Sequence, residues 1–211
     1  MSVGERPGAD IRTIAMEEVD AAAVCAARAF YEDPVLGWVQ PSLLRQQRRF
    51  PGVFSAVVAD SLATTWVAAV DGRVRGVASW LAPGDYPRSP RRDARLAARA
   101  LPAFLPPSDR SPTGIRLALA IERAHPRHRH WYLALLAVDP LVQHRGIGTA
   151  LLQPGLDRAD QDGVPAYLET QKPENVVWYG RSGFRQTGEF RVPPCPPVWA
   201  LTRDPVPPGP G

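Results

Sequence analysis

The chain has 211 residues, of which 45% are hydrophobic and 22% are charged. These values are ordinary for a soluble globular protein with one sizeable α/β domain or two small ones, and no apolar run is long enough to span a membrane. Residues 1–10 lack the apolar core of a signal peptide, so we expect a cytoplasmic protein without a membrane partner.

The formal net charge of +4 and the pI of about 9.5 raise the question of nucleic-acid binding. The arginines are spread along the chain, and Lys172 is its only lysine, so the excess indicates a bias toward arginine rather than a basic surface. We therefore expect no nucleic-acid partner. A modest positive charge would still favour an anionic small molecule.

Cysteine and histidine do not predict a metal site or a disulfide framework. Cys25 lies in an alanine-rich segment and Cys195 lies between prolines. Three of the four histidines fall in the segment 125–130, HPRHRH, with no cysteine or carboxylate at ligand spacing beside them. We interpret this segment as a solvated basic loop.

The first part of the chain predicts a strand, two helices and a hairpin from its apolar spacing. These elements cover residues 11–15, 16–30, 43–61, 64–70 and 74–81. The stretch 31–42 is expected to be a loop. Ser42 can cap the second helix, and Pro51-Gly52 should interrupt it. Asp71-Gly72 is a strong turn signal inside the hairpin.

Residues 83–130 hold two helical patterns, which we interpret as a helical insert before the fourth strand. The first pattern has an apolar face and an opposite face with Arg91, Arg92, Arg95 and Arg99. These arginines could bind an anionic ligand, but a solvated helix face is the simpler interpretation. The second pattern runs over residues 113–124.

The second half of the chain alternates strands and helices. We expect strands over 130–140 and 165–170, helices over 146–162 and 175–182, and final strands in FRQTGEF and VWALTR. This order predicts one α/β domain over residues 1–204, with a mixed, twisted sheet of about seven strands and flanking helices. The proline-rich tail at 205–211 should be disordered.

The loop at 143–148, QHRGIG, leaves an apolar strand and enters an apolar helix. A helix N-terminus has unpaired N–H groups, and glycine lets a ligand approach the backbone, so such a loop suits a phosphate or pyrophosphate. A dinucleotide fingerprint would need glycine in place of Leu151, and a Walker loop would need lysine in place of Thr149. The glycine pair alone is equally compatible with a plain loop-to-helix turn.

A longer pattern is present in the C-terminal half. It consists of Q-x-x-G-x-G after a strand that ends in Asp-Pro, then the strand PAYLET, Asn175, Tyr179 and Gly183-Phe184. Over roughly residues 130–190 this pattern resembles the GNAT acetyltransferases. The LQPG break, the GVPAYLET strand and the helical insert most resemble the branch of that superfamily that contains puromycin N-acetyltransferase.

This resemblance implies acetyl-CoA as the cofactor, held between two splayed central strands at 131–138 and 165–170. The pantetheine arm would then contact the backbone of Leu136, Ala137 and Val138 and the side chain of Asn175. The pyrophosphate would bind at Gln143, His144, Arg145, Gly146, Ile147, Gly148 and Thr149. His144 stands where the family more often has glycine.

The resemblance also implies catalytic roles. Tyr179, four residues after Asn175 on one helix face, would protonate the leaving thiolate as general acid. Without the family, a buried structural tyrosine would be the simpler interpretation. Glu169, near the end of its strand, could accept the proton of the amine directly or through water, or bind the cationic amine.

The acceptor side is open to several interpretations. Tyr31, Glu32, Asp33 and Trp38 are candidates to border an acceptor pocket together with the insert at 83–130. Helix capping or surface solvation would explain these four residues equally well.

The leading hypothesis is an N-acetyltransferase that moves an acetyl group from acetyl-CoA to a primary amine of a small molecule, for example an antibiotic or an aminonucleoside. A protein or peptide N-acetyltransferase and a catalytically silent acyl-CoA sensor are the alternatives. The chain could act as a monomer or as a homodimer.

Overall fold

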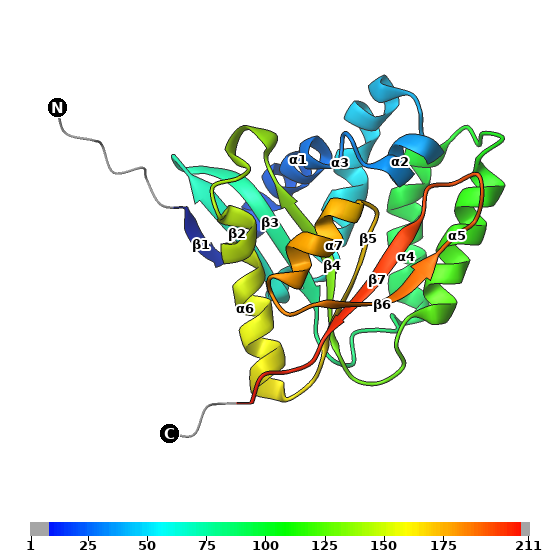
Figure 1. Ribbon diagram of the computed structural model, residues 1–211. Helices are drawn as coiled ribbons and strands as arrows, with labels where there is room; N and C mark the ends of the chain where they lie inside the picture. The colour runs from blue at the N-terminus through cyan, green and yellow to red at the C-terminus, as the bar shows by residue number, and fades with distance from the viewer. Residues whose placement is uncertain (1–8, 208–211) are drawn as a thin grey trace.

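Seven strands of the described chain form one mixed sheet with the order β1-β2-β3-β4-β5-β7-β6 (Figure 1). The computed structural model describes residues 9–207, so residues 1–8 of the predicted domain and 208–211 of the predicted tail lie outside it. The strands are β1 (Asp10–Thr13), β2 (Thr65–Val70), β3 (Arg73–Leu81), β4 (Trp131–Val138), β5 (Ala166–Thr170), β6 (Arg185–Phe190) and β7 (Val198–Arg203). Only the β4–β5 pair among them is parallel. The predicted α/β domain with a mixed sheet of about seven strands is confirmed.

Helices cover both faces of this sheet. They are α1 (Val19–Ala29), α2 (Pro34–Val39), α3 (Leu43–Asp60), α4 (Pro90–Ala100), α5 (Ser111–Ala124), α6 (Ile147–Asp162) and α7 (Pro173–Gly180). Helices α1 and α3 pack on one face, where Val67 and Val77 are buried. Helices α6 and α7 pack on the other, where Trp80 and Leu168 are buried. The predicted insert forms α4 and α5 beyond β6 and β7 (Figure 1).

Strands β4 and β5 are paired only where they begin. Their parallel register joins Trp131 to Ala166 and Tyr132 to Tyr167, and the strands diverge after these two pairs. On its other side, β4 contains a bulge, because Ser79 of β3 pairs with Leu135 while Trp80 pairs with Leu133. The predicted splay of the central strands is confirmed. The bulge at Ala134 was not predicted.

Two expectations for the first helices are wrong. Helix α3 continues through Pro51, since loss of one intrahelical hydrogen bond is outweighed by the burial of Phe50, Phe54 and Val58. Ser42 occupies the N-cap position without a side-chain cap.

The stretch 31–42, predicted to be a loop, contains α2. Asp33 begins this helix, because its Oδ1 accepts from the backbone N–H groups of Val35 at 3.0 Å and Leu36 at 2.8 Å. Pro34 follows at the first helical position, where its fixed φ suits the helix.

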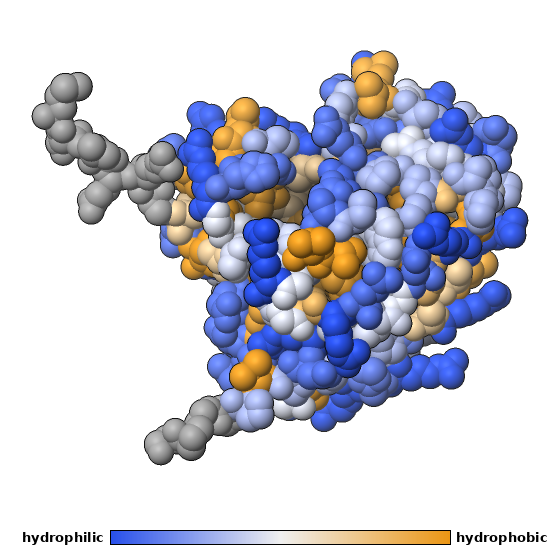
Figure 2. All heavy atoms as spheres, in the orientation of Figure 1, coloured by the Kyte–Doolittle hydropathy of each residue, from blue (hydrophilic) through white to orange (hydrophobic). Residues whose placement is uncertain are grey.

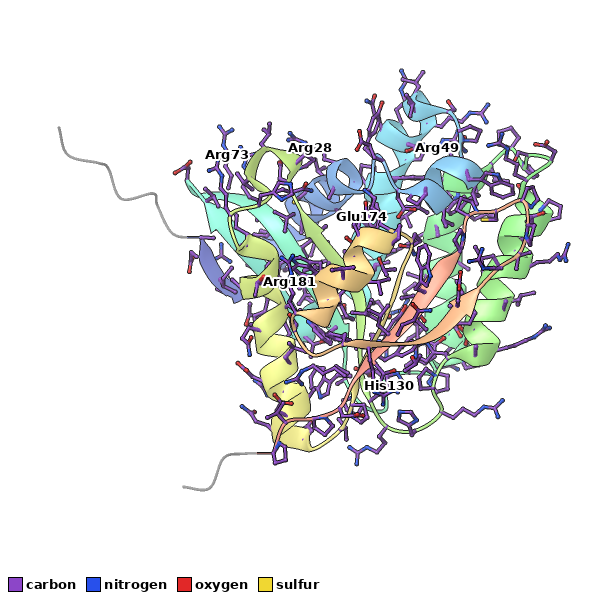
Figure 3. All side chains as sticks on the ribbon, viewed as in Figure 1. Arg28, Arg49, Arg73, His130, Glu174 and Arg181 are labelled. Atoms are coloured by element: carbon purple, nitrogen blue, oxygen red, sulfur yellow. The ribbon has the colours of Figure 1, made fainter. Side chains whose placement is uncertain are left out.

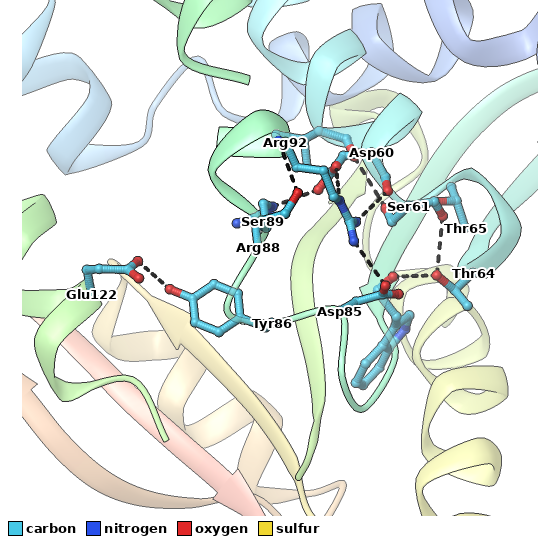
Figure 4. A network of polar contacts seen from close by, with 12 residues as sticks. Asp60, Ser61, Thr64, Thr65, Asp85, Tyr86, Arg88, Ser89, Arg92 and Glu122 are labelled. Atoms are coloured by element: carbon cyan, nitrogen blue, oxygen red, sulfur yellow. Dashed lines mark hydrogen bonds and ion pairs between the residues drawn. The ribbon is translucent and has the colours of Figure 1, made fainter. Parts of the chain in front are cut away.

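Arginines fix the insert to α3. Arg92 Nε donates to Asp60 Oδ1 at 2.9 Å and its Nη1 donates to Asp85 at 2.9 Å, while Arg88 Nε reaches Asp60 Oδ2 at 2.6 Å (Figure 4). Burial opposes ionisation of Asp60, but the hydrogen bonds from both arginines hold its pKa below the ordinary value. The expected solvated face is therefore wrong for Arg92. Arg91, Arg95 and Arg99 are exposed as expected.

The LQPG segment lies inside α6, which continues through Pro154. Gly155 is buried against the sheet, and a Cβ atom on it would lie 2.1 Å from Cε2 of Trp80. Since real Cβ atoms do not approach other carbon atoms so closely, this glycine allows α6 to contact the indole of Trp80 directly.

The described chain ends in a short irregular segment after β7. Residues 205–207 have no regular secondary structure, although the Val206 N–H donates to Asp160 Oδ1 at 2.7 Å.

Among the described helices, none has the length and apolar character that a membrane span needs. Exposed apolar side chains form separate patches on the face that Figure 2 shows. The exposed apolar residues include Leu43 and Leu44 at the start of α3 and Val177 on α7.

We predict that Gly155→Ala destabilises the fold by about 1–3 kcal/mol, because the new methyl group must displace Trp80. Gly52→Ala is the matched control. It lies inside α3 with open space around its missing Cβ, so alanine there should stabilise by about 0.5–1 kcal/mol. Chemical denaturation of both variants measures the two free energies of unfolding. Equal stability of the two variants would contradict the proposed contact.

Candidate active site

A cavity of about 550 Å³ opens where β4 and β5 diverge. Its wall comes from β4, the loop at 142–149, the end of β5 with the residues after it, α7, and the segment that joins α1 to α2. Glu174, at the start of α7, is one of the lining residues (Figure 3). The sheet is thus interrupted at its centre, and the exposed edges of two strands face one space.

The backbone of β4 presents polar groups to this cavity. The Asp139 N–H donates to the Arg75 carbonyl of the β3 side at 2.8 Å, and bonding alternates along an antiparallel ladder, so Ala137 is the next residue bonded to β3. Leu136 and Val138 therefore direct their N–H and C=O groups toward the side from which β5 has diverged. Of the three expected backbone contacts, these two have the orientation that a ligand in the cavity requires.

The loop at 143–148 leads from β4 to the start of α6 with two residues in the left-handed region. His144 has φ +61° and Gly146, the N-cap, has φ +80°. Glycine adopts this conformation without the steric cost that histidine carries at position 144. The Ala150 N–H makes the first intrahelical bond, to the Gly146 carbonyl. The preceding N–H groups, up to Thr149, point out of the helix start.

The predicted loop residues divide into three groups. His144, Gly146, Ile147, Gly148 and Thr149 line the cavity. Gln143 also lines it, but its Nε2 donates to the Val138 carbonyl at 3.0 Å and so fixes the loop to β4. Arg145 is exposed and does not line the cavity.

Gly148 has a second reason to be glycine. A Cβ atom there would lie 3.3 Å from Cζ2 of Trp178 on α7 and 3.7 Å from Val138. The absence of a side chain therefore brings α7 close to the start of α6. The sequence pattern gave no sign of this contact.

Helix α7 contributes polar side chains to the cavity wall. Asn175 Nδ2 donates to Thr170 Oγ1 at 3.0 Å, which orients the amide at the end of β5. Tyr179, one turn later, lines the cavity with only 7% of its surface exposed, and burial raises the pKa of its phenol. The phenol therefore remains a neutral proton donor over the whole physiological pH range.

Glu169 lies in the wall of the cavity with a side chain only 7% exposed. Its Oε1 is 3.3 Å from Nδ1 of His125. His125 and His130 are themselves buried, so the expected solvated basic loop is wrong for these two residues and right for the exposed His128. Tyr167 of β5 packs edge-on against both rings, and Tyr132 of β4 packs edge-on against His125. Within residues 9–207, no group of histidine, cysteine and carboxylate side chains could hold a metal ion.

One of the four predicted acceptor-side residues lines the cavity. Asp33 does so while it caps α2, and burial raises the pKa of its carboxyl group against the opposing effect of the cap hydrogen bonds. Tyr31 and Glu32 are exposed outside the cavity. Trp38 packs with Leu117 in a small separate cluster.

Several lining residues were missed in the sequence. Thr170 ends β5 and Lys172 comes two residues later. Trp178 precedes Tyr179, and Phe30 follows the last residue of α1. The single lysine directly after a predicted strand was a usable signal. The others carry no motif that separates them from ordinary core residues.

The family comparison agrees with this geometry. The model of the acetyltransferase (GNAT) family matches residues 27–184, more than half of the chain. The chain belongs to the GNAT acetyltransferase family. Its members use acetyl-CoA, and this chain is an acetyl-CoA-dependent N-acetyltransferase.

Solved acetyltransferases share the fold. The histone acetyltransferase HPA2 and related acetyltransferase of Corynebacterium glutamicum has a TM-score of 0.67 at 22% identity, over 96% of this chain and 99% of that one. The polyamine N-acetyltransferase of Drosophila melanogaster has a TM-score of 0.58 at 13% identity, over 93% and 99%. PaiA N-acetyltransferase of Thermoplasma acidophilum, solved with coenzyme A, has a TM-score of 0.59 at 10% identity, over 93% and 98%.

We predict that Gly148→Val weakens coenzyme A affinity about tenfold or more, because the branched side chain enters the space at the start of α6 and displaces Trp178. Isothermal titration calorimetry measures the Kd. Gly180→Ala, at the end of α7 where open space surrounds the missing Cβ, is the control and should bind as the unmodified chain does. An unchanged Kd for Gly148→Val would show that the ligand does not use this helix start.

Proposed function

We propose that this enzyme acetylates a primary amine of a small molecule, with Tyr179 as general acid and Glu169 as the group that takes the amine proton. The observation that carries the proposal is the gap between β4 and β5, whose wall contains a buried phenol and a buried carboxylate. Direct acetyl transfer to an amine needs a proton donor and a proton acceptor of this kind.

The residues present fit acetyl-CoA. The N–H groups at the start of α6 and the left-handed Gly146 form a cradle for a pyrophosphate, and the outward groups of Leu136 and Val138 offer a strand-like pairing edge for an extended amide chain. When bound, acetyl-CoA supplies an acetyl group activated as a thioester.

The chain's own groups would then act in sequence. The Val138 N–H, on the open side of β4, would donate to the acetyl carbonyl oxygen, where negative charge develops. Glu169 binds the protonated amine and takes its proton, so that the nitrogen lone pair becomes available. Tyr179, whose pKa is raised by burial, would give its proton to the departing sulfur.

The acceptor is proposed to be a compact cationic amine. Asp33 and Glu169 are both buried carboxylates on the cavity wall, and they would stabilise positive charge before it is removed. The finer relationship to the puromycin N-acetyltransferase-like branch rests on LQPG, on GVPAYLET and on the insert that forms α4 and α5. An antibiotic or aminonucleoside acceptor is the corresponding proposal.

A thiol-release assay with acetyl-CoA and a panel of amines tests this function. The panel holds a polyamine, an aminonucleoside, an aminoglycoside and a peptide with a free N-terminus. We expect turnover of at least one small amine and little turnover of the peptide. Preferential turnover of the peptide would favour a protein N-acetyltransferase, and tight coenzyme A binding without any turnover would favour an acyl-CoA sensor.

We predict that Tyr179→Phe lowers kcat on the order of 10²- to 10⁴-fold, the contribution of one general acid, while coenzyme A affinity stays nearly unchanged. The substitution removes only the hydroxyl, so the ring still packs against Phe184. Steady-state kinetics from pH 6 to 9 and calorimetry measure the two quantities. Full activity of the phenylalanine variant across this range would remove Tyr179 from the mechanism.

A further inference from the structure

A chain of three buried side chains leads away from the cavity. Glu169 Oε1 lies 3.3 Å from His125 Nδ1, His125 Nε2 lies 2.9 Å from His130 Nε2, and His130 Nδ1 lies 2.7 Å from the His128 carbonyl. His125 and His130 are 6% and 4% exposed. His130 stands at the start of β4, at the opposite end of the sheet from the start of α7 (Figure 3). The proposed function uses only the first member of this chain.

The contact between His130 Nδ1 and the His128 carbonyl determines which nitrogen carries the proton in each neutral ring. A backbone carbonyl only accepts hydrogen bonds, so His130 carries its proton on Nδ1 and presents a lone pair at Nε2. His125 must then donate from Nε2 to that lone pair, which leaves a lone pair on its own Nδ1. This second lone pair faces Glu169 Oε1, a buried oxygen without a hydrogen-bond partner among the described residues.

The three side chains Glu169, His125 and His130 can therefore hold one additional proton, in either of two arrangements. In the first, the proton is on Glu169 Oε1 and is donated to His125 Nδ1. In the second, it is on His125 Nδ1 and is donated to the carboxylate, while the original Nε2 proton of His125 has moved to His130 Nε2. Each contact joins one donor to one acceptor in both arrangements, and the second places the positive charge on His130.

We propose that His125 and His130 form a proton relay that removes the amine proton from Glu169; this proposal rests on the proposed role of Glu169. The amine N–H bond breaks as the Glu169 O–H bond forms. That O–H bond then breaks as His125 Nδ1–H forms, and His125 Nε2–H breaks as His130 Nε2–H forms. Glu169 is again a carboxylate, His125 is neutral in its other tautomer, and His130 holds the proton as an imidazolium.

The surroundings of the rings suit a proton in transit. Tyr86 stacks on His125 with ring centroids 3.7 Å apart, and its hydroxyl donates to Glu122 of α5 (Figure 4). Such a ring face stabilises a transient cation. Tyr132 and Tyr167 pack edge-on against His125. Burial, with the nearby Glu169 carboxylate, raises the pKa of both phenols, so they do not compete for the proton.

The far end of the relay lies next to an exposed turn, although His130 itself is buried. His130 follows an exposed turn that holds Arg127, His128 and Arg129. Burial is the main cause that lowers the pKa of His130, and it outweighs the opposing hydrogen bond to the His128 carbonyl and the opposing Glu169 carboxylate. The His130 imidazolium therefore gives its proton up readily to solvent water at this turn. The guanidinium of Arg88, 5.6 Å above the Tyr86 ring, also disfavours a charge that stays in this cluster.

Nitrogen NMR of the histidine rings in the unliganded chain tests the geometry without any assay of activity. At pH 8 we expect the Nε2–H tautomer for His125 and the Nδ1–H tautomer for His130. A His125 ring protonated on Nδ1 at this pH would overturn the relay, because Glu169 would already have its hydrogen bond.

His130→Gln tests the transfer itself. The glutamine amide oxygen can still accept from His125 Nε2–H, so the His125 tautomer is kept, but the amide cannot take up the proton. We expect kcat/KM for the amine to fall on the order of tenfold at pH 8, with an unchanged coenzyme A Kd. His128→Ala is the control, since only the carbonyl of His128 is used, and it should match the unmodified chain.

The outcomes separate the relay from the enzyme function. If His130→Gln keeps the His125 tautomer and full kcat/KM, the relay is wrong and the acetyltransferase proposal stands. If the unmodified chain acetylates no amine, the proposed function fails, and the NMR result still decides the tautomers. A fall in kcat/KM with a retained tautomer and a normal His128→Ala control supports the relay.

Discussion

The short pairing of β4 with β5 is the constraint on which the site depends. Two residue pairs hold the strands together at Trp131 and Tyr132, and the bulge at Ala134 bends β4 on its other edge. A sheet paired along its full length would bury the groups of Leu136 and Val138 in a ladder. The divergence instead directs them into a cavity, with the start of α6 above and α7 beside it.

Packing on both faces keeps this interruption open. Trp80 presses against Gly155 of α6 on one face, and α1 and α3 cover the other. Gly148 lets α7 approach the start of α6 through Trp178. The glycines of this region thus determine how closely helices approach, in addition to leaving space for a ligand. A larger residue at Gly148 or Gly155 would shift these helices and thereby change the site.

Much of the fold followed from local patterns. Apolar runs and turn signals such as Asp71-Gly72 located the strands, helical apolar spacing located most helices, and the Q-x-x-G-x-G loop located the start of α6. Helix α2 was missed because Pro34 and Gly37 resemble loop residues, although Asp33 and Pro34 together are also a helix start. Continuity through Pro51 depends on burial against the sheet, which local rules do not contain.

The site residues were predictable where they lie in one continuous segment. They were not predictable where they come from segments far apart in the sequence. Gly146, Asn175 and Tyr179 stand in continuous motifs. The contact of His125 with Glu169 joins residues from the end of α5 and from β5, and the charged neighbours of these histidines in HPRHRH suggested solvent instead. Only the folded structure, in which residues 125–130 lead into β4, shows that the rings of His125 and His130 are buried.

Hydrogen–deuterium exchange with and without acetyl-CoA tests the central claim most directly. The account predicts slower amide exchange at Leu136, Val138 and residues 147–149 when the coenzyme is bound, because these N–H groups would donate to it. Exchange in α4 should stay unchanged. Tight binding without protection at these amides, or with protection confined to another part of the chain, would contradict the account.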